Sequence, residues 1–222
     1  MKVIAINGSP RKNKNTAQML QNALEGAKNN GAETKMIHLS DLNYSGCKSC
    51  FACKAIDKKS YGMCVCKDDL TAILQEIEAA DVLILGSPFY FQSVTGTMRM
   101  FLERLLFPYL KYESGYPTLF QENLEIAFMY TMNITKEQLE KSYPFMRAEI
   151  EKNEHYLKHI LKSCHTLCAY DTYQFDDYTK YESSVFDPEH KKRVHENDFQ
   201  KSLQEAYLLG EKLSNRDEQQ EI

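Results

Sequence analysis

The amino-terminal stretch, residues 3–16 (VIAINGSPRKNKNT), constrains the fold of this chain more than any other. A short apolar and β-branched run, Val3 to Ile6, is followed by a Gly-Ser-Pro break and a basic, polar loop. From Thr16 onward, apolar residues recur at helical spacing as far as Gly31, a residue type that commonly ends helices. The stretch therefore predicts a strand, a loop and a helix. Free backbone N–H groups and the helix dipole at such a helix start favour a bound anion.

The rest of the chain continues this alternation of strands and helices. Further strands are expected at residues 33–39, 82–85, 124–130 and 166–172. Further helices are expected to begin near residues 68, 95, 135 and 187, with Asp68 and Asp187 as candidate caps. Pro144 is expected to break or kink the third of these helices, and the last is expected to reach Leu213. Such alternation predicts a parallel sheet with helices on both faces.

Length and charge restrict the possible partners. The 222 residues suffice for one α/β domain, expected over residues 1–213, with a polar tail at residues 214–222. Lys and Arg number 27 against 31 acidic residues, which gives a formal charge of −4. Because the chain has no basic character, neither nucleic acid nor a membrane surface is an expected partner. The first predicted strand begins without a leader pattern, and no apolar run approaches membrane-spanning length, so a cytoplasmic protein is expected.

The polar loop after the first strand differs from both familiar nucleotide signatures. The sequence GSPRKNKNT is neither G-x-G-x-x-G nor G-x-x-x-x-G-K-[ST], so a nucleoside triphosphate is not favoured. Its hydroxyl, guanidinium and amide groups suit one terminal phosphate monoester. They belong to Ser9, Arg11, Asn13, Asn15 and Thr16. The alternative is a solvated turn whose Lys and Arg side chains simply face water.

Five of the seven cysteines lie between Cys47 and Cys66, a pattern that suits a metal or redox cluster better than a disulfide framework. Cys47, Cys50 and Cys53 form Cys-x-x-Cys-x-x-Cys, and thiolates at that spacing can hold one face of an iron-sulfur cubane. Cys64 can close such a cluster. Two alternatives stay open. One is a zinc site, which usually has two separated Cys-x-x-Cys pairs, and the other is a set of free thiols without metal.

Three motifs together resemble the NADPH-dependent FMN reductase and iron-sulfur flavoprotein group of flavodoxin-like proteins. They are GSPRKNKNT after the first strand, GSPFYFQSVTGTMRMFLERL after the third, and a cysteine-rich loop ending in CxCKDDL. The resemblance covers the first half of the chain, and the second half follows the same order of elements. It implies a flavodoxin-like, doubly wound sheet of five parallel strands in the order 2-1-3-4-5, with helices on both faces.

The resemblance also implies a bound FMN. Its phosphate is expected on the five polar residues of the first loop named above. Its ring is expected against the loop after the third strand, where an apolar wall precedes a helix start with free N–H groups. The wall comprises Pro88, Phe89, Tyr90 and Phe91, and the helix start comprises Ser93, Val94, Thr95 and Gly96. A third flavin loop is expected at Thr131, Met132 and Asn133.

The function implied by this resemblance is that of an FMN-dependent oxidoreductase. It would pass electrons from NADH, NADPH or a carrier to a small-molecule or protein acceptor, and because the flavin carries the chemistry, no catalytic side chain is expected. One alternative is an electron-transfer protein with a [4Fe-4S] cluster on Cys47, Cys50, Cys53 and Cys64, although the ten-residue gap before Cys64 is longer than the compact family pattern. A second alternative is a flavodoxin-like binding module without catalysis. A homodimer or homotetramer is expected, with residues 107–120 as a contact.

Overall fold

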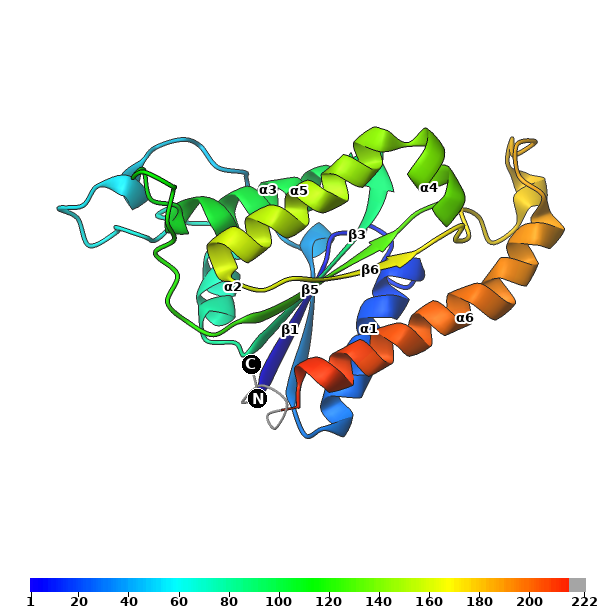
Figure 1. Ribbon diagram of the computed structural model, residues 1–222, viewed down its shortest axis with the longest axis horizontal. Coiled ribbons are helices and arrows are strands. Elements are labelled where there is room, and N and C mark those ends of the chain that lie inside the picture. Colours follow the sequence, from blue (N-terminus) through cyan, green and yellow to red (C-terminus); the bar gives the residue numbers. More distant parts are fainter. Residues whose placement is uncertain (216–222) are drawn as a thin grey trace.

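A central sheet of parallel strands organises the computed structural model, which describes residues 1–215 (Figure 1). The order is β2-β1-β3-β5-β6, which is the expected 2-1-3-4-5 arrangement of the parallel strands. The five strands are β1 (Lys2–Asn7), β2 (Glu33–His38), β3 (Val82–Tyr90), β5 (Glu125–Thr131) and β6 (His165–Ala169). A sixth strand, β4 (Ser93–Val94), pairs antiparallel with the end of β3, so the expectation of five strands was incomplete.

Helices cover both faces of the sheet (Figure 1). One face carries α1 (Asn15–Asn29) and α6 (Pro188–Leu213), and the other carries α2 (Asp69–Glu78), α3 (Gly96–Leu106) and α5 (Pro144–Leu161). A short helix, α4 (Lys136–Ser142), follows β5. Alternate strand residues point to opposite faces, so there are two hydrophobic cores. Ile4 and Phe128 belong to the core beneath α2, α3 and α5, whereas Val3 and Met129 belong to the core beneath α1 and α6.

The helix ends follow local sequence signals. Asp68 caps α2 in a capping box with Thr71, and Asp187 caps α6, which ends at Leu213 as predicted. Pro144 separates α4 from α5 at the expected position. The strand expected at residues 166–172 already ends at Ala169.

The carboxyl-terminal end of the chain was expected to be a polar tail from residue 214. Ser214 is buried and donates from Oγ to the Gly210 carbonyl, and residues 216–222 of the expected tail lie outside the described part. Among residues 1–215, no helix is both long and apolar enough to cross a membrane.

Two glycines bring α1 and α6 into backbone contact. A Cβ atom placed on Gly26 would lie 2.0 Å from the Tyr207 carbonyl oxygen, and one on Gly210 would lie 1.9 Å from the Ala23 carbonyl oxygen. No side chain fits between the helices at this crossing. The position of α1 against the sheet therefore depends on α6.

The segment after α3 folds largely inward. Phe120 is buried and packs edge-on against Tyr109, with 5.1 Å between ring centroids. Tyr112 and Tyr116 are exposed by 59% and 56%. Of the expected subunit contact at residues 107–120, only part is therefore available at the surface.

Candidate functional site

The loop between β1 and α1 lies at the carboxyl ends of the central strands. The Gly8 N–H donates to the Gly86 carbonyl at 2.8 Å, which joins the loop to the end of β3. Within the loop, the Ser9 N–H donates to Asn7 Oδ1 at 2.9 Å, and the Arg11 N–H donates to Ser9 Oγ at 3.2 Å. The loop is thus folded by its own short polar side chains.

The start of α1 is buried and uncapped. It has no side-chain cap and no acidic residue in its first turn, while Asn15 and Thr16 are buried. Within residues 1–215, the backbone N–H groups of Asn13, Asn15 and Thr16 have no hydrogen-bond partner. Unpaired donors at a helix start, together with the helix dipole, suit a bound anion.

Residues 173–176 cover this loop from the other half of the chain. Arg11 Nη1 donates to the Gln174 carbonyl at 2.8 Å, and Asn15 Nδ2 donates to the Tyr173 carbonyl at 2.8 Å. Lys14 pairs with Asp176 at 2.6 Å. We call residues 173–176 the strap. Nothing in the local sequence indicated it, because its partners lie about 160 residues away.

The segment after β3 is a hairpin rather than an open loop. Phe91 and Gln92 form its two-residue turn, with φ angles of 50° and 63°. Such positive φ angles favour Gly or Asn, so the turn is strained. Phe89 points inward and stacks on Tyr130 at 5.3 Å, whereas Phe91 is fully exposed. The expected apolar wall is therefore split between the core and the surface.

The expected helix start after this hairpin is present at Thr95, which joins the hairpin to the first loop. Thr95 caps α3 by accepting from the Met98 N–H at 3.2 Å. Its hydroxyl donates to the Gly8 carbonyl at 2.8 Å. The Val94 side chain is buried in the core, so only its backbone faces the site.

The third expected loop also meets the first. The buried hydroxyls of Thr16 and Thr131 are hydrogen-bonded at 2.8 Å. The Asn133 side chain is engaged elsewhere, because its Oδ1 accepts from the buried Lys191 ammonium at 2.6 Å. Lys191 also pairs with Asp171, which accepts from His190 as well. The structure thus brings three of the expected loops together at one edge of the sheet.

A buried carboxylate supports the hairpin. Glu149 of α5 accepts from Ser93 Oγ at 3.0 Å and pairs with Arg99 and Lys152. Burial alone would raise the pKa of Glu149, but Lys152, Arg99 and Ser93 together hold it below its ordinary value. The sequence analysis missed Glu149, because a glutamate three residues before a lysine is typical of an exposed helix face.

The cysteine-rich segment encloses a separate cavity beside α3. Cys47, Cys50, Cys53, Cys64 and Cys66 all line it. They are free thiols, and no three Cys, His, Asp or Glu side chains of residues 1–215 converge on a point suited to one metal ion. This geometry does not fit a mononuclear zinc site.

Charged side chains hold the cysteine segment in place. Arg104 of α3 is 1% exposed, and its Nε donates to Cys64 Sγ at 2.9 Å. The same guanidinium pairs with Asp68 at 2.8 Å and holds the pKa of that carboxyl below its usual range. Earlier in the segment, Lys54 donates to the carbonyls of Phe107, Pro108 and Leu110.

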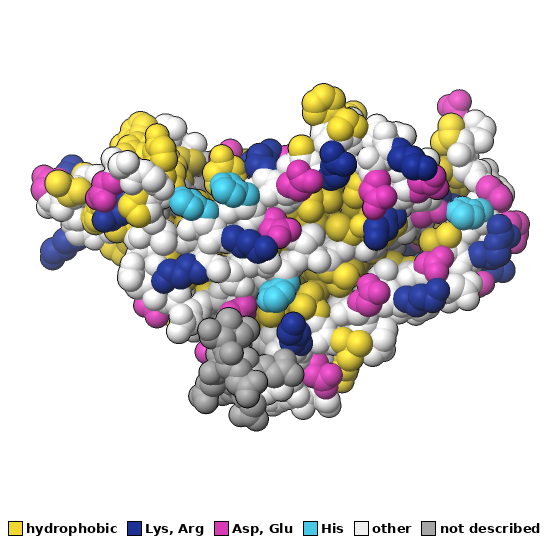
Figure 2. All heavy atoms as spheres, viewed as in Figure 1, with side chains coloured by type: hydrophobic (Ala, Val, Ile, Leu, Met, Phe, Trp, Pro, Cys, Tyr) yellow, Lys and Arg dark blue, Asp and Glu magenta, His cyan; other side chains and the backbone are white. Residues whose placement is uncertain are grey.

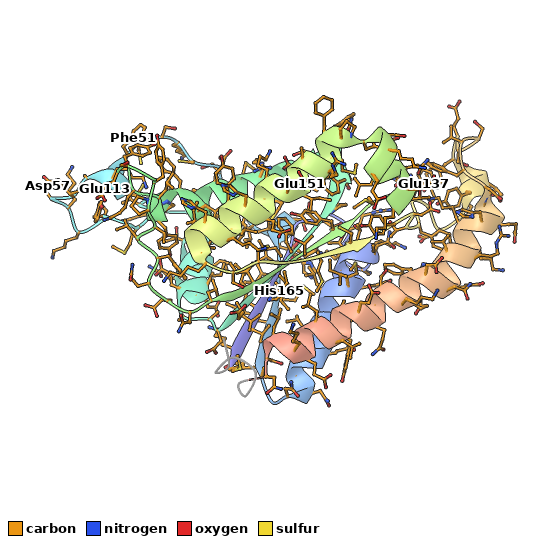
Figure 3. The ribbon with its side chains drawn as sticks, in the orientation of Figure 1. Phe51, Asp57, Glu113, Glu137, Glu151 and His165 are labelled. Atoms are coloured by element: carbon orange, nitrogen blue, oxygen red, sulfur yellow. The ribbon has the colours of Figure 1, made fainter. Side chains whose placement is uncertain are left out.

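The cysteine segment forms one end of the molecule. Figure 3 places Phe51 and Glu113 together at this end, far from Glu137 of α4. Figure 2 shows hydrophobic side chains gathered over the same region, where Phe51 is 49% exposed. The Phe107 ring lies 6.1 Å from the Phe51 ring and 6.2 Å from the Tyr112 ring, so this aromatic surface is continuous.

Comparison with known proteins identifies a family and several relatives by sequence. A family model described as NADPH-dependent FMN reductase matches residues 1–120. An iron-sulfur flavoprotein of Archaeoglobus fulgidus is 38% identical over 109 residues, which cover 49% of this chain and 47% of that protein. An iron-sulfur flavoprotein of Methanocaldococcus jannaschii is 39% identical over 104 residues, covering 47% and 51%. The chain thus spans about half the length of the curated relatives it matches.

Solved structures share the fold over nearly the whole chain. An NAD(P)H:quinone oxidoreductase from Methanothermobacter marburgensis superposes with a TM-score of 0.70 at 15% identity, covering 96% of this chain and 98% of that one. An FMN-dependent NADH-azoreductase from Bacillus anthracis, solved in complex with FMN, gives 0.65 at 14% identity, covering 97% and 100%. At such low identity these likenesses show a common flavodoxin-like fold.

Proposed function

Because the chain belongs to the NADPH-dependent FMN reductase family, we propose that it binds FMN and passes electrons from NADH or NADPH to a small acceptor. The observation that carries the proposal is the uncapped start of α1, where the N–H groups of the buried Asn15 and Thr16, and of the exposed Asn13 just before the helix, are unpaired. A phosphate monoester satisfies such donors. The chemistry of the site is therefore suited to the terminal group of FMN.

The loops after β1, β3 and β5 would each bind a different part of FMN. Ser9, Arg11 and Thr16 add side-chain donors to the phosphate-binding N–H groups. The backbone of Ser93, Val94, Thr95 and Gly96 would contact the polar edge of the ring, together with Thr131 and the backbone of Asn133, whose side chain binds Lys191. Pro88, Tyr90 and Phe91 would supply the apolar surface beside it, whereas Phe89 packs against the core.

FMN, when bound, supplies the hydride and one-electron chemistry. The protein's own contribution is to hold the cofactor and exclude water from it. Thr95 ties the hairpin to the phosphate loop through the Gly8 carbonyl, and Glu149 holds Ser93 from behind. These contacts fix the relative position of the two loops, which determines where the ring lies.

Titration of the apoprotein with FMN tests this site, with flavin fluorescence as the readout. Thr16→Ala removes a buried hydroxyl from the proposed phosphate site, and loss of one hydrogen bond to a charged group costs about 1.5–3 kcal/mol. We expect FMN affinity to fall by at least about tenfold. Thr166→Ala, on the exposed start of β6, is the matched control and should bind like the wild type. Equal affinities for both variants would place the phosphate elsewhere.

A second proposal concerns the cysteine cavity. We propose that Cys47, Cys50, Cys53 and Cys64 hold a [4Fe-4S] cluster, which would pass electrons between the flavin and a partner. A cubane cluster takes one thiolate at each of four iron corners, so its ligands surround a space rather than converge on a point. The observation that supports this proposal is that these four cysteines line one cavity. Iron and acid-labile sulfide in anaerobically prepared protein support it, and their absence after reconstitution refutes it.

We also propose that the chain forms a homodimer or homotetramer. The exposed aromatic surface of Phe51, Tyr112 and Tyr116 supports this proposal. Light scattering at working concentration tests it, and a monomer mass removes it.

A further inference from the structure

We infer that Arg104 is a positioning residue that raises the reduction potential of the redox centre in the cysteine cavity, through its hydrogen bond to the Cys64 sulfur. The inference rests on the cluster proposed above. Arg104 lies outside the cysteine segment and outside the flavin loops.

The placement of the guanidinium is the first observation. Arg104 is 1% exposed, so its charge faces the cavity wall rather than solvent. Its Nε lies 2.9 Å from Cys64 Sγ. A guanidinium does not lose its proton in proteins, so this sulfur has a permanent cationic donor beside it.

The other hydrogen bonds of Arg104 fix the orientation of its guanidinium group. Nη1 and Nη2 donate to the two carboxylate oxygens of Asp68, at 2.8 and 3.2 Å. Nη1 also donates to the Ser45 carbonyl at 2.9 Å. Asp68 is itself held as the cap of α2. Because these contacts occupy the far end of the guanidinium, the Nε–H stays directed at Cys64.

The effect on potential follows from charge. Reduction of a cluster held here would add one electron and no atoms. Reduced FMN would donate that electron, after NADH or NADPH has reduced the flavin by hydride transfer. The added negative charge would lie partly on the cysteine sulfurs. A hydrogen-bond donor with positive charge stabilises the reduced form more than the oxidised form, and hydrogen bonds to sulfur are among the factors that set these potentials. Arg104 therefore favours electron flow into the cavity.

Helix α3 connects this residue to the flavin loops. Thr95 caps α3 beside the phosphate loop, and Arg104 follows nine residues later on the same helix. At a rise of 1.5 Å per residue, the two positions are about 14 Å apart along the axis. One rigid element thus sets both the hairpin and the donor to Cys64.

The test measures the midpoint potential in an anaerobic redox titration followed by electron paramagnetic resonance. Arg104→Gln removes the charge and the fixed donor, and we expect the equilibrium for reduction to fall by about tenfold, or about 59 mV for a one-electron couple. Lys48→Gln is the matched control, because Lys48 lines the same cavity but is exposed. Solvent screens its charge, so the potential should stay at the wild-type value.

The outcomes separate the two proposals. Wild-type protein without iron and sulfide removes the cluster itself. Arg104→Gln with full iron content and an unchanged potential overturns the role of Arg104 alone. If Arg104→Gln does not retain iron, the midpoint potential of Arg104→Lys tests the inference, because the lysine ammonium keeps the positive charge but lacks the fixed Nε donor. A potential below wild type in that variant supports the inference, and an equal potential overturns it.

Discussion

Replacing Gly210 with Ala should separate the two helices that cover one face of the sheet. The added Cβ would lie 1.9 Å from the Ala23 carbonyl oxygen and 2.6 Å from its carbon, both backbone atoms of α1. No side-chain rotation relieves such a contact, so α1 or α6 must move as a whole. Because α1 begins at the phosphate loop, the displacement reaches the proposed FMN site.

The magnitude follows from two opposing terms. Overpacking costs about 1–3 kcal/mol, and a clash with backbone belongs at the upper end of that range. The higher helix propensity of Ala than of Gly offsets about 1 kcal/mol of this loss in unfolding free energy. The net loss is then about 2 kcal/mol, which corresponds to a fall in Tm of about 4–8 °C for a chain of this size. Weaker FMN binding should accompany it.

Thermal unfolding of the apoprotein, followed by circular dichroism, measures this effect. Gly96→Ala is the matched control, because a Cβ there meets nothing within 4 Å at the start of α3. Its Tm should stay equal or rise slightly. A double variant with Gly26→Ala should lose less than the sum of the single losses, since both act on one crossing. A Tm for Gly210→Ala at or above that of Gly96→Ala would refute the reasoning.

Two further predictions concern buried charges. Glu149→Gln should lower the unfolding free energy at pH 7. The folded pKa of Glu149 is depressed, so its contribution to the free energy of unfolding is present above the ordinary carboxyl pKa and is lost as pH falls through the folded pKa. The free energy of unfolding in urea should therefore vary less with pH below about 5 for the variant than for the wild type. Lys191→Met leaves Asp171 without its buried partner and should cost about 3 kcal/mol in urea unfolding at pH 7, whereas His190→Ala removes a half-exposed pair and should cost under about 1 kcal/mol. Equal losses for the last two variants would contradict the assigned roles.

Features with local causes could be predicted from the sequence. Asp68 and Asp187 precede helix starts, and Pro144 removes an N–H that a continuous helix needs, so each signal lies within a few residues of its effect. The order of the parallel strands followed from the family resemblance. The predictions of the helix ends are confirmed because short-range capping and proline geometry decide them, and the strand order is confirmed because the family shares it.

Features set by distant contacts could not be predicted. Arg104 and Cys64 are 40 residues apart, and Ser93 and Glu149 are 56 residues apart. Only the folded sheet brings either pair together. The split of the expected apolar wall after β3 has a different cause: Phe91 lies in a two-residue turn, which leaves its ring in solvent, while Phe89 packs against the core.

The anchoring of the cysteine segment separates its position from its thiols. Arg104 pairs with Asp68 at the carboxyl-terminal end, and Lys54, in the middle of the segment, donates to the Pro108 carbonyl. Neither contact involves a cysteine side chain. Cysteine-to-serine variants leave both contacts in place, so the loss of a ligand and the loss of the loop's position can be measured separately.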